Sequence, residues 1–269
     1  MESVRDAAAV RARVVAIPRA APGYSTNLYA AGDQIERWCA DGRASLLSTG
    51  DALLLLQADR DFHHVFHVAG SRAALGRALE RLPAGTWVTD LIGQGDALEE
   101  SCAAYADAGF APHGFLRRMV RVQPGGEPSE GDAEIATPAD APGVAAFLDR
   151  LLDRFAEQVP GAAELAEEAA AGRLLLVRRD DGAVAGMLMY ALKGRTAQLR
   201  FWHVDAYARG RGVGRRLMAG FLARCAAAGR LVLWVIGDNH RSIAIYRHYG
   251  FEADGLVDRI MILRKEAPR

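Results

Sequence analysis

A segment near position 210 combines glycine and arginine in a way that suits a phosphate group. It reads ARGRGVGRRL over residues 208–217, and a helix is expected to start at Gly212 or Val213. A helix N-terminus presents unpaired N–H groups and the positive end of its dipole, and glycines let those amides approach an anion closely. Arginines add charge-assisted hydrogen bonds to phosphate oxygens. The residues concerned are Arg209, Gly210, Arg211, Gly212, Gly214 and Arg215.

This composition predicts a diphosphate-binding loop, with a glycine-rich turn that binds nothing as the alternative. Two other phosphate loops do not fit. A P-loop ends in Gly-Lys followed by Ser or Thr, and the chain has no Lys-Ser or Lys-Thr pair. A dinucleotide fingerprint needs a glycine where Arg215 stands. Asp238 has the place of a ribose-binding acid, but the expected hairpins before the loop argue against that fold.

A second segment, Asp238–Phe251, gives the loop a context. With it, the sequence resembles the GNAT superfamily (GCN5-related N-acetyltransferases). Residues 209–214 fit the family's R/Q-x-x-G-x-G/A loop at every defined position. Asn239, Ala244, Tyr246 and the pair Gly250-Phe251 fit the downstream pattern that ends in Y-x-x-x-G-F. The resemblance covers about 174–263 and is faint in the N-terminal half.

The resemblance implies a mixed sheet that opens between the third and fourth strands of this half, where the pantetheine arm of acetyl-CoA enters. The main chain at 203–205 would pair with that arm, and the loop would hold the pyrophosphate. Tyr246 would be the catalytic general acid, since a phenol can protonate the departing thiolate. A core tyrosine is the alternative for Tyr246. The implied cofactor-binding residues are His203, Val204, Asp205, Arg209, Gly210, Arg211, Gly212, Val213, Gly214, Arg215 and Asn239.

No general base stands out on the strand before the loop. Counting back from Val204 in steps of two, the expected site-facing residues are Trp202, Arg200 and Gln198, none of which is a base. Alternation points His203 to the opposite face. Arg200 and Trp202 are therefore expected to bind substrate, with Arg200 holding a carboxylate of the acceptor.

The elements that must position these residues follow from hydrophobic periodicity and turn signals. Helices are expected at 142–159 and 162–171, from 212 or 213 to Gly229, and from about Asn239 to Gly250. Strands are expected at 173–178, 184–192, 196–204, 231–236 and 256–263.

The N-terminal half repeats parts of this order. Tyr105, Gly109 and Phe110 match Tyr246, Gly250 and Phe251 at a spacing of 141 residues. The segment 71–76 takes the place of the loop, with Ala74 where Gly212 should be. This half is thus expected to be a degenerate copy that binds CoA poorly, with Tyr105 structural. The alternative is that any two mixed helix–strand halves look alike at this level.

The expected organisation is a degenerate GNAT-like domain at 1–122, a linker at 123–141 rich in Pro, Gly and acids, and a catalytic domain at 142–269. The fold class is α+β: tandem GNAT-like domains, each a twisted mixed, largely antiparallel sheet flanked by helices.

Composition narrows the partners. Thirty-three basic and 33 acidic side chains leave no basic excess, so nucleic acid is not expected as a partner. Cys39, Cys102 and Cys225 lack disulfide or zinc spacing, which favours the cytoplasm. Alternation along a strand places His63 and His67 on one face and His64 on the other. No third ligand is evident beside the pair, so no metal is expected. Neither a signal peptide nor a membrane span is expected, and the apolar run 52–56 is too short to cross a bilayer.

The expected function is an acyltransferase that moves an acetyl or other short acyl group from acyl-CoA, its co-substrate, to a primary amine. The acceptor would be a small molecule such as an amino acid or similar carboxylated amine, and the protein a monomer or homodimer. Two alternatives remain: a non-enzymatic acyl-CoA sensor, and an enzyme resembling the tandem-domain mycothiol synthases.

Overall fold

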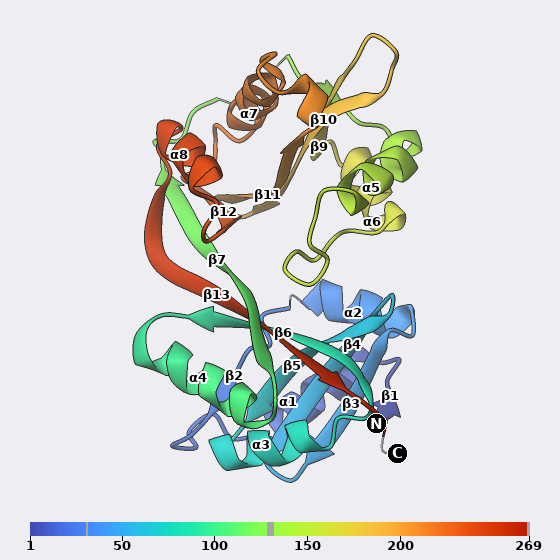
Figure 1. Ribbon diagram of the computed structural model, residues 1–269, viewed down its shortest axis with the longest axis vertical. Helices are drawn as coiled ribbons and strands as arrows, with labels where there is room; N and C mark the ends of the chain where they lie inside the picture. The colour runs from blue at the N-terminus through green and yellow to red at the C-terminus, as the bar shows by residue number, and fades with distance from the viewer. Residues whose placement is uncertain (31, 128–131, 268–269) are drawn as a thin grey trace. The chain divides into compact units, whose positions relative to one another are not determined.

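The structure is a computed structural model that describes residues 1–30, 32–127 and 132–267. The chain divides into two compact units, one made of Met1–Leu116 with the segment from Leu256 onward, the other of Arg117–Gly255. Each unit is a largely antiparallel sheet with helices packed against it (Figure 1).

The first unit has the strand order β1-β3-β4-β5-β6-β13, and β2 pairs with β5. Only β5 and β6 are parallel among these pairs. One core holds side chains of α3 and α4, and the other holds side chains of α1 and α2. The strands are β1 Glu2–Ser3, β2 Ser25–Thr26, β3 Ala44–Thr49, β4 Ala52–Asp59, β5 Phe62–Ala69, β6 Gly85–Gly93 and β13 Glu252–Lys265; the helices are α1 Ala7–Val15, α2 Gly32–Ala40, α3 Arg72–Glu80 and α4 Gly95–Asp107.

The second unit has the strand order β7-β12-β11-β10-β9-β8. The core on one face of its sheet includes α7 and Tyr246 of α8, and the core on the other face includes α5 and α6. The strands are β7 Ala111–Val122, β8 Glu134–Ile135, β9 Leu174–Arg178, β10 Val184–Lys193, β11 Thr196–Val204 and β12 Arg230–Ile236; the helices are α5 Ala141–Asp149, α6 Ala162–Ala170, α7 Val213–Arg224 and α8 His240–His248.

Most elements expected in this unit form where the periodicity placed them. The four-residue spacing of Val213, Leu217, Phe221 and Cys225 buries all four against the sheet. The expected helix at 142–159 is wrong, because α5 ends at Asp149. Downstream, the Asp153 carboxylate accepts from the Phe155 N–H and the Asp153 carbonyl from the Glu157 N–H, so local turn bonds replace the helix.

A β-bulge corrects the expected facing of β11. Met189 is opposite Phe201 and the next residue, Tyr190, is opposite Leu199, so Arg200 has no partner on β10. The extra residue shifts the alternation by one. The face with Trp202 and Val204 therefore continues to Leu199 and Ala197, and strict alternation is wrong for Arg200 and Gln198.

The two units are not two consecutive halves of the sequence. β13 pairs with β6 over Val257–Lys265, so the last strand of the sequence completes the first unit. β7 begins in the first unit, and its residues from Arg117 onward belong to the second. The compact units thus differ from the expected segments 1–122 and 142–269.

The expected linker at 123–141 also belongs to the second unit. The Gln123 N–H donates to the Gly229 carbonyl, and β8 pairs with β9. Residues 128–131 of this segment lie outside the described residues.

Candidate active site

The sheet of the second unit opens between β11 and β12. Their parallel pairing covers Thr196–Leu199 with Arg230–Leu233 and ends there. From the bulge at Arg200 to Val204, β11 keeps β10 on one side and, among the described residues, has no partner strand on the other. This opening lies between the two strands where the family resemblance implied it. It leaves a strand edge free for an extended ligand.

The loop after β11 leads into an uncapped helix. Gly212 is the N-cap of α7 with φ 80° and gives no side-chain hydrogen bond, so the first N–H groups of α7 lack a cap. Gly210 has φ 77°, and a Cβ built on either glycine meets nothing within 4 Å. These two glycines are needed for their left-handed backbone, and the space beside them is open.

Two further glycines hold the start of α7 close to the sheet. A Cβ on Gly214 would lie 3.3 Å from Cζ2 of Trp202, and one on Gly186 of β10 would lie 2.8 Å from Cγ1 of Val213. Gly214 therefore serves helix–strand packing. Gly186 was missed by sequence reasoning, because a glycine inside a strand gives no sign of which helix will cross it.

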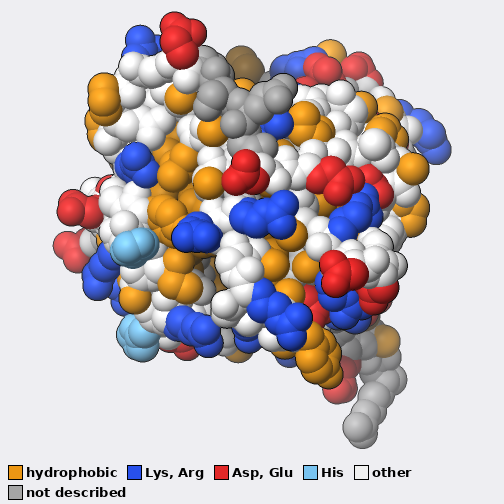
Figure 2. Space-filling model, turned by 90° about the horizontal axis from the view of Figure 1, so that it is seen from above, with side chains coloured by type: hydrophobic (Ala, Val, Ile, Leu, Met, Phe, Trp, Pro, Cys, Tyr) orange, Lys and Arg blue, Asp and Glu red, His pale blue; other side chains and the backbone are white. Residues whose placement is uncertain are grey.

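The loop arginines are exposed. Within the described residues, the side chains of Arg209, Arg211 and Arg215 form no ion pair or hydrogen bond. On the face seen in Figure 2, Lys and Arg side chains are scattered among hydrophobic, acidic and other side chains. Three unpaired guanidinium groups beside uncapped helix amides are suited to a diphosphate.

Tyr246 is buried on α8 beside the opened strand. Its ring centroid is 5.6 Å from that of Trp202 and 6.0 Å from that of Phe251. The hydroxyl has no hydrogen-bond partner among the residues that the structure describes. Burial, with the nearby Glu157 charge, raises the pKa of Tyr246, so the phenol stays protonated and can act as a proton donor.

Glu157 is the titratable group that sequence reasoning missed. It lies in the turns between α5 and α6, and its charge acts on Tyr246. Burial raises the pKa of Glu157 from its usual 4.5 to about 7. A carboxylate with that pKa is suited to exchange protons at neutral pH. The sequence contains Glu157 inside an expected helix, and only the turns at Asp153 bring it here.

The remaining predicted residues have other contacts. The His203 ring lies 6.4 Å from that of Phe201, centroid to centroid, and burial lowers the pKa of His203 to about 4, so it is a weak base. The Asp205 N–H donates to the Ala185 carbonyl, and the Asn239 side chain caps α8 by accepting from the Ser242 N–H at 3.0 Å. Arg200 donates from Nη1 to Oε1 of Glu164 on α6 at 2.6 Å.

In the described part of the first unit, no long loop stands between β5, which ends at Ala69, and the N-cap of α3 at Ser71. Ser71 is the N-cap of α3, and its hydroxyl accepts from the Ala74 N–H at 3.2 Å. Ala74 therefore lies inside the helix, and Ser71 has the place that Gly212 has in the second unit. The expected match of Ala74 with Gly212 is wrong by three residues.

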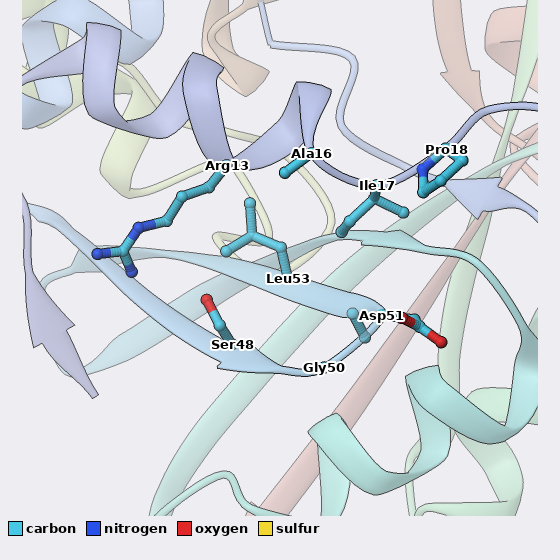
Figure 3. A pocket seen from close by; sticks show the side chains of 9 residues that line it. Arg13, Ala16, Ile17, Pro18, Ser48, Gly50, Asp51 and Leu53 are labelled. Atoms are coloured by element: carbon cyan, nitrogen blue, oxygen red, sulfur yellow. The ribbon is translucent and has the colours of Figure 1, made fainter.

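A pocket outside this site occurs in the first unit. A pocket of about 200 Å³ lies between the end of α1 and the β3–β4 turn of the first unit, and Arg13, Ser48 and Asp51 are among its lining residues (Figure 3). It contains none of the predicted site residues. Among the described residues, no group of three His, Cys, Asp or Glu side chains could hold a metal ion, and no helix is long and apolar enough to cross a membrane.

Comparison with known proteins agrees with this geometry. Residues 144–251 match the acetyltransferase (GNAT) family. A GCN5-related N-acetyltransferase from Sphaerobacter thermophilus is similar in structure with a TM-score of 0.62 and 14% identity, over 89% of this chain and 88% of that one. A tandem GNAT protein from the clavulanic acid biosynthesis pathway is similar with a TM-score of 0.59 and 16% identity, over 98% of this chain and 94% of that one.

One curated relative, an uncharacterised protein of Mycobacterium leprae, is 52% identical over 56 residues. The match covers 21% of this chain and 15% of the relative. The structural neighbours, at their low identity, show the fold alone, and that fold confirms the expected pair of GNAT-like domains. Residues 144–251 therefore form a domain of the acetyltransferase (GNAT) family, within a chain whose fold is that of a tandem GNAT protein.

Proposed function

We propose that the second unit transfers an acetyl or other short acyl group from acyl-CoA to the primary amine of a small molecule. The loop Arg209–Arg215 and the start of α7 bind the pyrophosphate. The free edge of β11 after Leu199 pairs with the pantetheine arm. The reacting thioester then lies in the opening between β11 and β12, close to Tyr246.

The proposed chemistry is a direct transfer. The amine nitrogen attacks the thioester carbonyl, a C–N bond forms, and the C–S bond breaks. The amine gives up its proton to the Glu157 carboxylate, and the departing thiolate takes the Tyr246 hydroxyl proton. Orientation of the two substrates supplies much of the rate, and no covalent enzyme intermediate is needed.

One observation carries the proposal: beside an opened strand edge, a buried tyrosine whose hydroxyl has no partner among the described residues is affected by the charge of Glu157, a carboxyl whose own pKa is raised by burial. Two groups whose pKa values are both shifted by burial are typical of an acid–base pair. The proposal does not use Arg200 as a carboxylate clamp, because Glu164 already holds that guanidinium.

The first test is turnover of acetyl-CoA with a panel of primary amines that includes amino acids, amino sugars and polyamines, read as release of CoA thiol. With the best acceptor, Tyr246→Phe should lower kcat by about 10²-fold or more and leave the Kd for acetyl-CoA unchanged, because only the proton donor is lost. Tyr105→Phe, the matched change in the first unit, should leave kcat within about twofold.

Tight binding of acetyl-CoA without turnover of any amine would contradict the enzyme and indicate a sensor. An unchanged kcat in Tyr246→Phe would remove the assigned acid.

A further inference from the structure

The sheet of the first unit has an opening equivalent to the one between β11 and β12. β5 and β6 pair in parallel only at His63 with Trp87 and His64 with Val88. Beyond these pairs the two strands separate, as β11 and β12 do after Leu199. The backbone of the first unit therefore has the space that receives pantetheine in the proposed function of the second.

Asn27 fills this space with its own side chain. The amide nitrogen donates to the Val65 carbonyl of β5 at 3.2 Å, and to the Asp90 carbonyl and Thr89 hydroxyl of β6 at 3.0 Å and 2.8 Å. Its oxygen accepts from the His67 N–H at 2.6 Å. Asn27 is 1% exposed, so one buried amide bridges both strands of the opening.

The chain on either side of Asn27 runs along the edge of β5. Ser25 and Thr26 pair with Ala69 and Val68 as the short strand β2. The Thr26 hydroxyl donates to the His67 carbonyl at 2.7 Å, and the Asn27 N–H donates to the same carbonyl at 3.3 Å. An extended segment of the chain thus makes the main-chain contacts that an extended ligand would make there.

The segment also reaches the start of α3 and the repeated tyrosine. A Cβ on Gly23 would lie 3.2 Å from Cα of Ser71, the residue that caps α3. The Ser25 hydroxyl is 3.3 Å from Nε2 of His67, and Nδ1 of the same ring is 3.0 Å from the Tyr105 hydroxyl. The position equivalent to Tyr246 is therefore closed into a buried polar network.

We propose that residues 23–29 are a permanent internal occupant of the cofactor opening in the first unit, so that this unit binds no acyl-CoA and each chain takes one. The inference rests on the proposed function only for the identity of the ligand that is kept out. The occupant and its contacts belong to the first unit, so they can be tested apart from turnover.

The test is amide hydrogen exchange followed by mass spectrometry on the full chain, with and without acetyl-CoA. Peptides covering residues 24–29 should be protected about 100-fold or more over an unstructured chain. Their exchange should not change when acetyl-CoA is added to the wild type or to Gly212→Glu, which disables the loop of the second unit. Asn27→Ala should speed exchange in this segment by about tenfold and leave peptides of the second unit unchanged.

Calorimetric titration of acetyl-CoA measures the number of binding sites per chain. One site in the wild type and none in Gly212→Glu is the expected result. A second site, or a change in exchange at 24–29 on adding acetyl-CoA to Gly212→Glu, would overturn the inference, as would fast exchange of the segment in the free protein. If the wild type binds no acyl-CoA while 24–29 stays protected, the proposed function fails and the internal occupant stands.

Discussion

Tyr246 and Tyr105 have the same place in the repeated helix, yet different chemistry is open to them. In both, the N–H of the phenylalanine five residues later donates to the tyrosine carbonyl, and the two rings meet edge to face. The Tyr105 hydroxyl is 3.0 Å from Nδ1 of His67, whereas the Tyr246 hydroxyl has no partner among the described residues and is affected by the charge of Glu157. The surroundings decide which tyrosine can give up a proton.

Glu157→Gln is the sharpest test at this scale. The active form is the carboxylate, so kcat/KM of the wild type should rise with pH through about 7, the raised pKa of Glu157, and level off above it. The acceptor in this experiment should be an aromatic amine, because it stays unprotonated across this pH range and its own titration does not alter the profile. Glu157→Gln should lower kcat/KM by about 10²-fold and flatten the profile. Glu252→Gln, at an exposed carboxyl of the same unit, should change neither.

The same pKa shift predicts a stability effect with a defined sign. Because folding raises the pKa of Glu157 from 4.5 to about 7, the folded state disfavours the charge, and the free energy of unfolding should fall as pH rises between these values. Glu157→Gln should remove this fall and stabilise the protein at pH 8 by up to about 3 kcal/mol. Denaturant unfolding at pH 5 and pH 8 measures it. An equal effect at both pH values would contradict the burial of this charge.

At the scale of elements, the start of α7 distinguishes the two units. In the second unit an eight-residue path from Val204 leads to an N-cap without a side chain, whereas in the first unit Ser71 follows β5 within two residues and caps α3. A helix N-terminus without a side-chain cap leaves its first N–H groups available to an anion, whereas the Ser71 hydroxyl already accepts from one of them in α3. In the proposed function the loop, more than the helix itself, therefore makes the binding site.

Gly212→Glu should therefore abolish cofactor binding. A side chain at φ 80° strains the backbone, and its carboxylate repels the pyrophosphate at the helix N-terminus. Calorimetry should show a loss of at least about 100-fold in affinity for acetyl-CoA. Gly143→Glu, at an exposed glycine of α5 with open space around it, adds the same charge and should bind normally. Normal binding by Gly212→Glu would place the cofactor elsewhere.

At the scale of the whole molecule, the order of the chain and the compact units differ. β13 is drawn in red because it ends the sequence, yet it pairs with β6, and Met261 is buried in the core of the first unit (Figure 1). A unit whose last strand follows the other unit in the sequence cannot be completed until residues 117–255 have been made.

Met261→Ala and Met218→Ala form a matched pair of variants that tests whether β13 belongs to the first unit. Each removes a buried methionine and should cost about 2–5 kcal/mol of stability. In limited proteolysis near the melting temperature, Met261→Ala should expose cleavage sites within 1–116, and Met218→Ala within 117–255. If Met261→Ala sensitised only 117–255, the assignment of β13 to the first unit would be wrong.

The sequence by itself determined the local chemistry. Regular periodicity placed α8, the strands β9 to β12 and the start of α7 within about two residues, because each pattern depends on near neighbours. The end of α7 was placed wrongly, because the helix stops at Arg224 and not at Gly229. The two motifs at 209–214 and 239–251 identified the family and the loop without tertiary information. The spacing of Tyr105 and Tyr246 also indicated the repeat, which the whole-chain likeness to a tandem GNAT protein confirms.

Tertiary structure decided which residues and strands face one another. The bulge at Arg200 depends on its pairing with β10, and the position of Glu157 depends on turns that replaced an expected helix. Asn27 is 38 residues or more from the groups that its side-chain amide contacts, and β13 joins a strand that precedes it by more than 150 residues. Apart from the local turns at Asp153, these outcomes depend on contacts between segments that are separate in the sequence, which no local pattern of residues encodes.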